Sequence, residues 1–79
     1  MHVTIKLWRP GLDEGRQEAA LTLEDKQGAG EYGYRITFGI LGWPSLSDVR
    51  DLTYFYDATV VFGNRLSIAI YDGWQIEEG

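Results

Sequence analysis

Three stretches of the chain alternate between apolar and polar residues, and this alternation constrains the fold more than any other feature of the sequence. The stretches are residues 3–8, 18–24 and 34–41. Because successive side chains of a β-strand point to opposite faces, a period of two predicts strands with one buried face. Polar or glycine-rich segments separate the stretches, and strands that follow one another along a chain usually pair. We therefore expect an antiparallel sheet in which the second and third strands form a hairpin.

The segment that follows Pro44 supports two assignments. Ser47 is a plausible helix N-cap, and the next residue, Asp48, places a carboxylate in the first turn, where the helix dipole favours it. Apolar residues then recur every three positions, which predicts a short helix near residues 47–53. The alternative is that residues 52–56 already form a strand, because their β-propensity is high.

The last third of the chain predicts a second hairpin. Residues 59–62 and 65–71 have the composition of strands, and they flank Gly63 and Asn64. Glycine supplies the positive φ that a two-residue hairpin turn needs, so this spacing favours a tight turn. We interpret residues 72–73 as a bulge or bend through which the last strand continues. The alternative is that these two residues turn the chain back.

These assignments describe one domain over residues 1–79. The predicted fold class is α+β, with a small antiparallel β-sheet of about five strands and one short helix. A parallel sheet would need long helices alternating with strands, and the pattern contains none.

Charge and composition disfavour several classes of partner. The chain has 12 acidic and 7 basic residues, a net charge of −5, and its basic residues are dispersed. Direct binding to nucleic acid or to an anionic membrane is therefore disfavoured, and a basic partner protein is the better electrostatic match. No apolar run approaches the ~20 residues that span a bilayer, and the N-terminal residues do not have the pattern of a signal peptide. We expect a cytoplasmic protein, which agrees with the absence of cysteine.

The sequence contains no constellation typical of catalysis. His2 is the only histidine and there is no cysteine, so neither a nucleophile–histidine arrangement nor a zinc site is expected. Gly28, Gly30 and Gly33 match a dinucleotide-binding spacing, but the string leads into a strand pattern instead of a helix. We therefore expect no enzyme activity, no cofactor and no metal, and we interpret these glycines as flexibility in a hairpin.

Aromatic residues give the strongest indication of a binding surface. Residues 54–56 are three consecutive aromatics, and a single helix or strand cannot turn all three toward one core. Exposed Trp and Tyr are enriched at protein-binding hot spots because they combine a large apolar area with a polar tip. The alternative is that the aromatics complete a small core. The expected anchors are Trp43, Tyr54, Tyr56 and Trp74, and the expected rim charges are Asp48, Asp51, Glu77 and Glu78.

Elimination leaves a non-enzymatic protein-binding module as the expected function. In size and charge the chain is similar to small phage-encoded anti-defence proteins and to bacterial toxin-immunity proteins, a similarity of profile that carries over no residues. That profile implies an inhibitor or neutraliser of a nucleic-acid-handling protein. The alternative is a structural or assembly subunit that forms a homo-oligomer or part of a virion, because exposed sheet edges and aromatics can serve self-association.

Overall fold

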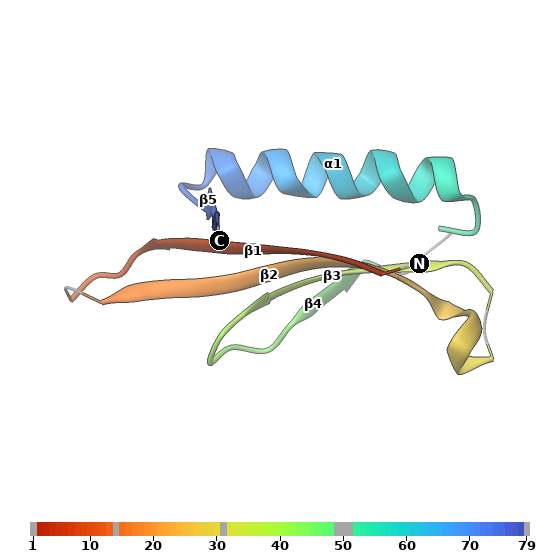
Figure 1. The fold of residues 1–79 in the computed structure, drawn as a ribbon, viewed down its shortest axis with the longest axis horizontal. Coiled ribbons are helices and arrows are strands. Elements are labelled where there is room, and N and C mark those ends of the chain that lie inside the picture. Colours follow the sequence, from red (N-terminus) through yellow and green to blue (C-terminus); the bar gives the residue numbers. More distant parts are fainter. Residues whose placement is uncertain (1, 14, 31, 49–51, 79) are drawn as a thin grey trace.

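The computed structural model describes residues 2–13, 15–30, 32–48 and 52–78. Within these residues, five antiparallel strands form one sheet in the order β4-β3-β2-β1-β5, and one α-helix lies across a face of it (Figure 1). The predicted fold class is therefore confirmed. The elements are β1 (His2–Pro10), β2 (Arg16–Asp25), the 3-10 helix η1 (Lys26–Ala29), β3 (Tyr34–Ile40), β4 (Leu46–Asp48), α1 (Phe55–Tyr71) and β5 (Gln75–Ile76).

The three alternating stretches form the three central strands of the sheet, as predicted. The first two pair from His2 opposite Glu24 onward, and the second pairs with the third, which confirms the predicted hairpin between them. Ile5 lies opposite Leu21, and Leu21 lies opposite Phe38. This register aligns the apolar side of every strand, so one face of the sheet is apolar from β1 to β3.

Residues 55–71 form α1, and the predicted hairpin at Gly63 and Asn64 is wrong. Ala58 and Ala69 are both buried, eleven residues or three helical turns apart, so they lie on one helix face against the sheet. Gly63 and Asn64 fall on the exposed side of the helix. The β-branched residues of this segment favour a strand locally, but packing of a continuous helical stripe on the sheet outweighs that preference.

The predicted helix near residues 47–53 is also wrong. Its first residues belong to β4, in which Leu46 pairs with Phe38 of β3, while residues 49–51 lie outside the described part of the chain. The alternative strand over residues 52–56 is not found either, because α1 begins within that range. A serine N-cap such as Ser47 is a local signal. In the structure, backbone N–H and C=O groups of this segment are instead paired with those of β3, which is distant in the sequence.

Residues 72–73 end α1, so the predicted bulge or bend within a continuing strand is wrong. Gly73 adopts a φ of 96°, and its N–H donates to the carbonyl of Ile70, while the N–H of Trp74 donates to the carbonyl of Ala69. These two hydrogen bonds define a Schellman helix end, for which glycine is the preferred residue because it carries no Cβ. The chain then reverses, and β5 pairs with β1.

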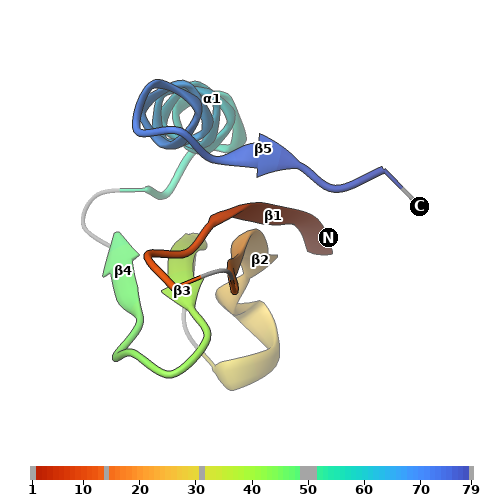
Figure 2. The same cartoon turned by 90° about the vertical axis from the view of Figure 1, so that its left-hand side faces the viewer.

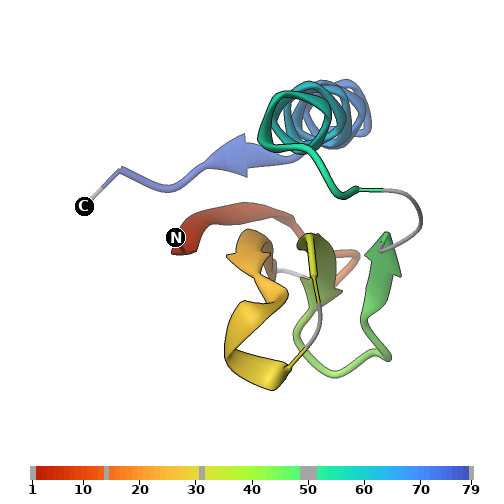
Figure 3. The ribbon, with the colours of Figure 1, turned by 90° about the vertical axis from the view of Figure 1, so that its right-hand side faces the viewer.

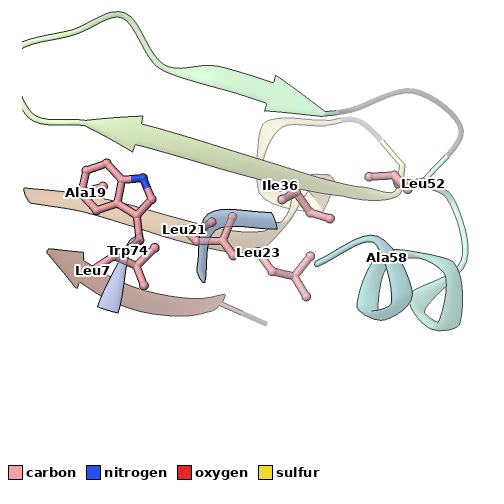
Figure 4. Packing of buried hydrophobic residues seen from close by; sticks show 9 residues of the cluster. Leu7, Ala19, Leu21, Leu23, Ile36, Leu52, Ala58 and Trp74 are labelled. Carbon is pink, nitrogen blue, oxygen red and sulfur yellow. The ribbon is translucent and has the colours of Figure 1, made fainter. Parts of the chain in front are cut away.

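The core lies between α1 and the sheet. Leu7, Leu21 and Ile36 are fully buried, Trp74 lies at one end of the cluster, and Ala58 lies at the other (Figure 4). Figure 2 and Figure 3 show α1 on one face of the sheet and η1 on the opposite side. The helix thus covers a single face, and within the described residues no α-helix covers the other face.

Replacing Gly63 with Ala should stabilise the protein, because Gly63 lies in mid-helix and an added Cβ would meet nothing within 4 Å. Alanine is favoured over glycine inside a helix by about 0.8–1 kcal/mol. Thermal unfolding followed by circular dichroism should show a midpoint raised by roughly 3–8 °C. A lowered midpoint would instead favour a turn at this position, since a hairpin turn needs the positive φ that alanine resists.

Candidate functional site

A groove of about 540 Å³ runs between α1 and the β3–β4 edge of the sheet. Its size falls in the range of small-molecule and peptide pockets, and most of its lining is apolar. The floor is sheet and the far wall is the C-terminal half of the helix. The apolar lining consists of Leu21, Ile36, Phe38, Leu46, Ile68, Ala69 and Trp74, and the polar lining consists of Ser47, Asp48, Arg65 and Asp72.

The groove exists because α1 lies over the middle of the sheet and leaves its β4 edge uncovered. Among the strands, the helix makes its main contacts with β2 and β3, and β4 is joined to it through an ion pair between Asp48 and Arg65. Leu46 on β4 is 73% exposed, and Ile68 on the helix is 52% exposed. Two large apolar side chains therefore flank the groove with half or more of their surface in water, which is a feature of interaction sites in monomeric domains.

An ion pair joins the two walls of the groove. The Arg65 Nη2 atom lies 2.6 Å from the Asp48 Oδ2 atom, so a residue of α1 is tied to a residue of β4. The Asp48 side chain is 18% exposed, whereas that of Arg65 is 40% exposed. The pair sets the width of the groove at this point and leaves one side of the guanidinium open to solvent.

Trp74 forms the floor at one end of the groove, and it is a core residue. It is 3% exposed, packs its ring edge-to-face with Phe38 at a centroid distance of 5.8 Å, and lies under the guanidinium of Arg9 at 4.2 Å. The expectation that Trp74 would be an exposed anchor is therefore wrong. The Schellman helix end explains its burial, because this motif turns the residue after the glycine back onto the helix.

The other predicted anchors are exposed but do not form one patch. Trp43 is 68% exposed in the turn between β3 and β4, whereas Tyr54 and Tyr56 are exposed at the start of α1. Figure 1 shows the turn between β3 and β4 below the C-terminal end of α1, well away from the start of the helix. None of the three lines the groove.

The predicted rim charges are also dispersed. Asp48 lines the groove, Glu77 pairs with Arg16 at 2.9 Å, and Glu78 is exposed beside β5. Asp51 lies outside the described residues. Of the seven predicted site residues that the structure describes, it brings only Asp48 and Trp74 into the groove.

The sequence did not identify four residues whose side chains line the groove: Phe38, Leu46, Arg65 and Ile68. Leu46 precedes the helix predicted near residues 47–53, and Ile68 was assigned to the strand predicted over residues 65–71. If residues 55–71 had been predicted as a helix, Ile68 would have fallen beside the buried face of that helix, three residues after Arg65. The signal available for that reading was the spacing of Ala58 and Ala69.

The opposite face of the sheet is polar. Thr4, Thr22, Thr37 and Ser47 form one row across β1 to β4, and the hydroxyl oxygens of Thr37 and Ser47 lie 3.3 Å apart. Hydroxyl pairs across strands stabilise a sheet and need no ligand. We interpret this row as the solvated face of the sheet.

The glycine string lies in the connection between β2 and β3. Gly30 ends η1 with a φ of 78°, and Gly33 has a φ of 102°. A Cβ at Gly33 would lie 2.7 Å from the Leu52 carbonyl oxygen. These glycines therefore allow the backbone conformation that precedes β3. A dinucleotide-binding glycine string differs, because it joins a strand to the start of a long helix.

Within the described residues, no group of three or more His, Cys, Asp or Glu side chains is placed to hold a metal ion. In the same part of the chain, no helix combines the length and the apolar character needed to cross a bilayer. Comparison with protein family models, with curated proteins and with solved structures found no match to this chain.

Proposed function

We propose that the protein is a non-enzymatic protein-binding module whose docking site is the groove between α1 and the β3–β4 edge. The observation that carries this proposal is the pair of exposed apolar walls, Leu46 and Ile68, above an apolar floor. When a partner buries such walls, apolar surface is removed from water, which stabilises the complex by roughly 25 cal/mol per Å² of that surface.

The occupant that fits best is an extended segment of another protein. β4 is an edge strand, and β3 is its neighbour in the sheet, so its outer backbone groups can pair with an added strand. In β4, Leu46 and Asp48 face the helix side while Ser47 faces away. Alternate side chains of an added strand would therefore enter the groove, and their fit to it would give specificity.

The charge of the chain favours a basic partner. With a net charge of −5, the protein attracts a positively charged surface and raises the rate of encounter with it. Proteins that handle nucleic acids carry such surfaces. The biological form that fits a small acidic module is an inhibitor or neutraliser of that class, of the anti-defence or immunity type.

Site-specific photo-crosslinking tests the location of the docking site. A benzophenone amino acid replaces Leu46, and in a matched control it replaces Lys6, which is exposed on β1. In native lysate we expect a discrete adduct from position 46 and none of that mass from position 6. Excess unlabelled protein should suppress the adduct, and excess Ile68→Glu protein should not.

Two results would contradict the proposal. One is the same set of adducts from positions 46 and 6, which would indicate non-specific capture. The other is a position-46 adduct that the Ile68→Glu protein suppresses as well as the unaltered protein does, since the helix wall of the groove would then take no part in binding.

A further inference from the structure

The hydrogen bonds between β2 and β3 show which residues of β3 bond to β4. The Leu41 N–H donates to the Glu18 carbonyl at 2.9 Å, and the Lys26 N–H donates to the Gly33 carbonyl at 2.9 Å. Both bonds continue the β2–β3 register beyond its two ends. In an antiparallel pair every second residue bonds to the same neighbour, so the odd-numbered residues of β3 bond to β2. The even-numbered residues of β3 therefore bond to β4.

Ser47 carries the open backbone groups of β4. Leu46 and Asp48 lie opposite even-numbered residues of β3, so their N–H and C=O groups are used within the sheet. Ser47 lies opposite Thr37, and the two hydroxyl oxygens are 3.3 Å apart, which agrees with a non-hydrogen-bonded pair, whose side chains approach closely. Because β4 is the last strand at this edge of the described sheet, the N–H and C=O of Ser47 point away from β3 toward a free edge.

Asp72 carries the unbalanced charge of the groove lining. Asp48 and Arg65 form an ion pair, whereas the Asp72 carboxylate has no hydrogen bond or ion pair within the described part of the chain. Arg9 lies nearby, but it donates to the main-chain carbonyl of Asp72. The last turn of α1 contains no basic residue. The partial negative charge of the helix C-terminus therefore adds to that of the carboxylate, and this end of the groove favours a cation.

We infer that the groove binds an extended segment, antiparallel to β4, in which a large apolar residue stands two positions before a lysine or arginine. This inference rests on the proposed function, because it specifies what the docking site recognises. The segment adds a strand beyond β4, and one of its residues exchanges two backbone hydrogen bonds with Ser47. The residues on either side of that one turn their side chains toward the helix, beside Asp48 and Leu46.

The direction and spacing of α1 and β4 place the two side chains of this motif. Arg65 is bonded to Asp48, and α1 runs antiparallel to β4 (Figure 1). Asp72, two turns after Arg65, therefore lies beyond the Leu46 end of β4. The side chain opposite Leu46 meets the apolar wall at Ile68. The next side chain on that face follows ~7 Å along the strand, and Asp72 follows Ile68 by ~6 Å along the helix axis, so a cation there reaches the Asp72 carboxylate.

Selection of a phage library of random peptides, each of about twelve residues, tests the motif. On the unaltered protein we expect an apolar residue followed two positions later by lysine or arginine to be enriched about tenfold over the starting library. On Asp72→Lys protein, aspartate or glutamate should replace the basic residue. This variant should fold, because a cation is favoured at a helix C-terminus. Glu78→Lys, which makes the same change of charge at an exposed residue outside the groove, should keep the original preference.

Ser47→Pro tests the backbone contact separately. Proline has no N–H, and it is tolerated in an edge strand where that N–H would face away from the sheet. The variant should therefore fold, as measured by circular dichroism, and should bind an enriched peptide about tenfold more weakly than Ser47→Ala protein in fluorescence anisotropy. Equal affinities in the two variants, or a Ser47→Pro protein that fails to fold, would show that the Ser47 backbone groups are not open as described, and would overturn the added strand.

Different results would contradict the motif and the docking site. Peptides that bind the unaltered protein but not Leu46→Glu protein, and that lack the motif or carry its two residues in reverse order, overturn the motif and leave the docking site in place. An unchanged preference on Asp72→Lys protein does the same. Peptides that bind Leu46→Glu protein as tightly as the unaltered protein overturn the docking site itself, and a library that yields no binder overturns both.

Discussion

Replacing Trp74 with Ala should lower the free energy of unfolding by about 3–5 kcal/mol. The side chain is 3% exposed, contacts Phe38 and Arg9, and closes one end of the core. A domain of this length has a total stability of about 4–12 kcal/mol, so the variant should lose from about a quarter to all of its stability. Urea denaturation followed by circular dichroism measures the loss directly.

Trp43→Ala is the matched control for that experiment, because it removes the same side chain from a turn where it is 68% exposed. Its unfolding free energy should stay within about 0.5 kcal/mol of the unaltered protein, as for most surface substitutions. Equal losses in the two variants would mean that Trp74 does not pack as described. The comparison also separates the core tryptophan from the exposed one, which the sequence alone could not do.

Gly33→Ala should cost about 2–4 kcal/mol, the second largest effect we expect, because two penalties add. Gly33 has a φ of 102°, which an L side chain resists, and its added Cβ would lie 2.7 Å from the Leu52 carbonyl oxygen. That oxygen cannot move aside freely, since it accepts a hydrogen bond from the Tyr34 N–H at 2.8 Å. The loss should appear as a lower midpoint in urea denaturation.

Gly30→Ala isolates the first of those penalties. Gly30 also has a positive φ, 78°, but an added Cβ would meet nothing within 4 Å. We expect a cost of about 1 kcal/mol from the backbone conformation alone. If Gly30→Ala proved as costly as Gly33→Ala, the close approach to Leu52 would have no energetic consequence and the packing of that segment against β3 would be misdescribed.

The first half of the fold could be predicted because its signals are local. Alternation in residues 3–8, 18–24 and 34–41 reports which face of each strand is buried, and consecutive strands pair with their neighbours. The ends of the three strands differ from the predicted ends by at most two residues. No long-range information was needed to obtain β1, β2, β3 and the pairing between the last two.

The second half depended on tertiary context. Gly63 and Asn64 are a strong hairpin signal between β-branched residues, yet they lie on the exposed side of a helix. An uncovered apolar sheet face needs a second layer, and residues 55–71 form the helix that provides it. Ala58 and Ala69 marked the face of that helix, but alanine gives a weak hydrophobic signal in a sequence.

The groove could not be predicted because its walls come from segments far apart in the chain. Leu46 on β4 and Ile68 on α1 are 22 residues apart, and the sequence analysis placed neither of them in the element to which it belongs. Conspicuous residues such as Trp43 and Tyr54 did prove exposed, but exposure alone did not bring them together. Aromatic content in a small acidic domain therefore predicted a binding surface but not its position in the fold.

Affinity for the partner captured at position 46 tests the central claim most directly. The comparison uses Leu46→Glu, in the groove, and Thr4→Glu, which adds the same charge on an exposed position of the opposite face. We predict that Leu46→Glu weakens binding at least tenfold, or by about 1.4 kcal/mol, and that Thr4→Glu changes it less than twofold. Unchanged affinity in Leu46→Glu, or an equal loss in both variants, would contradict docking in the groove.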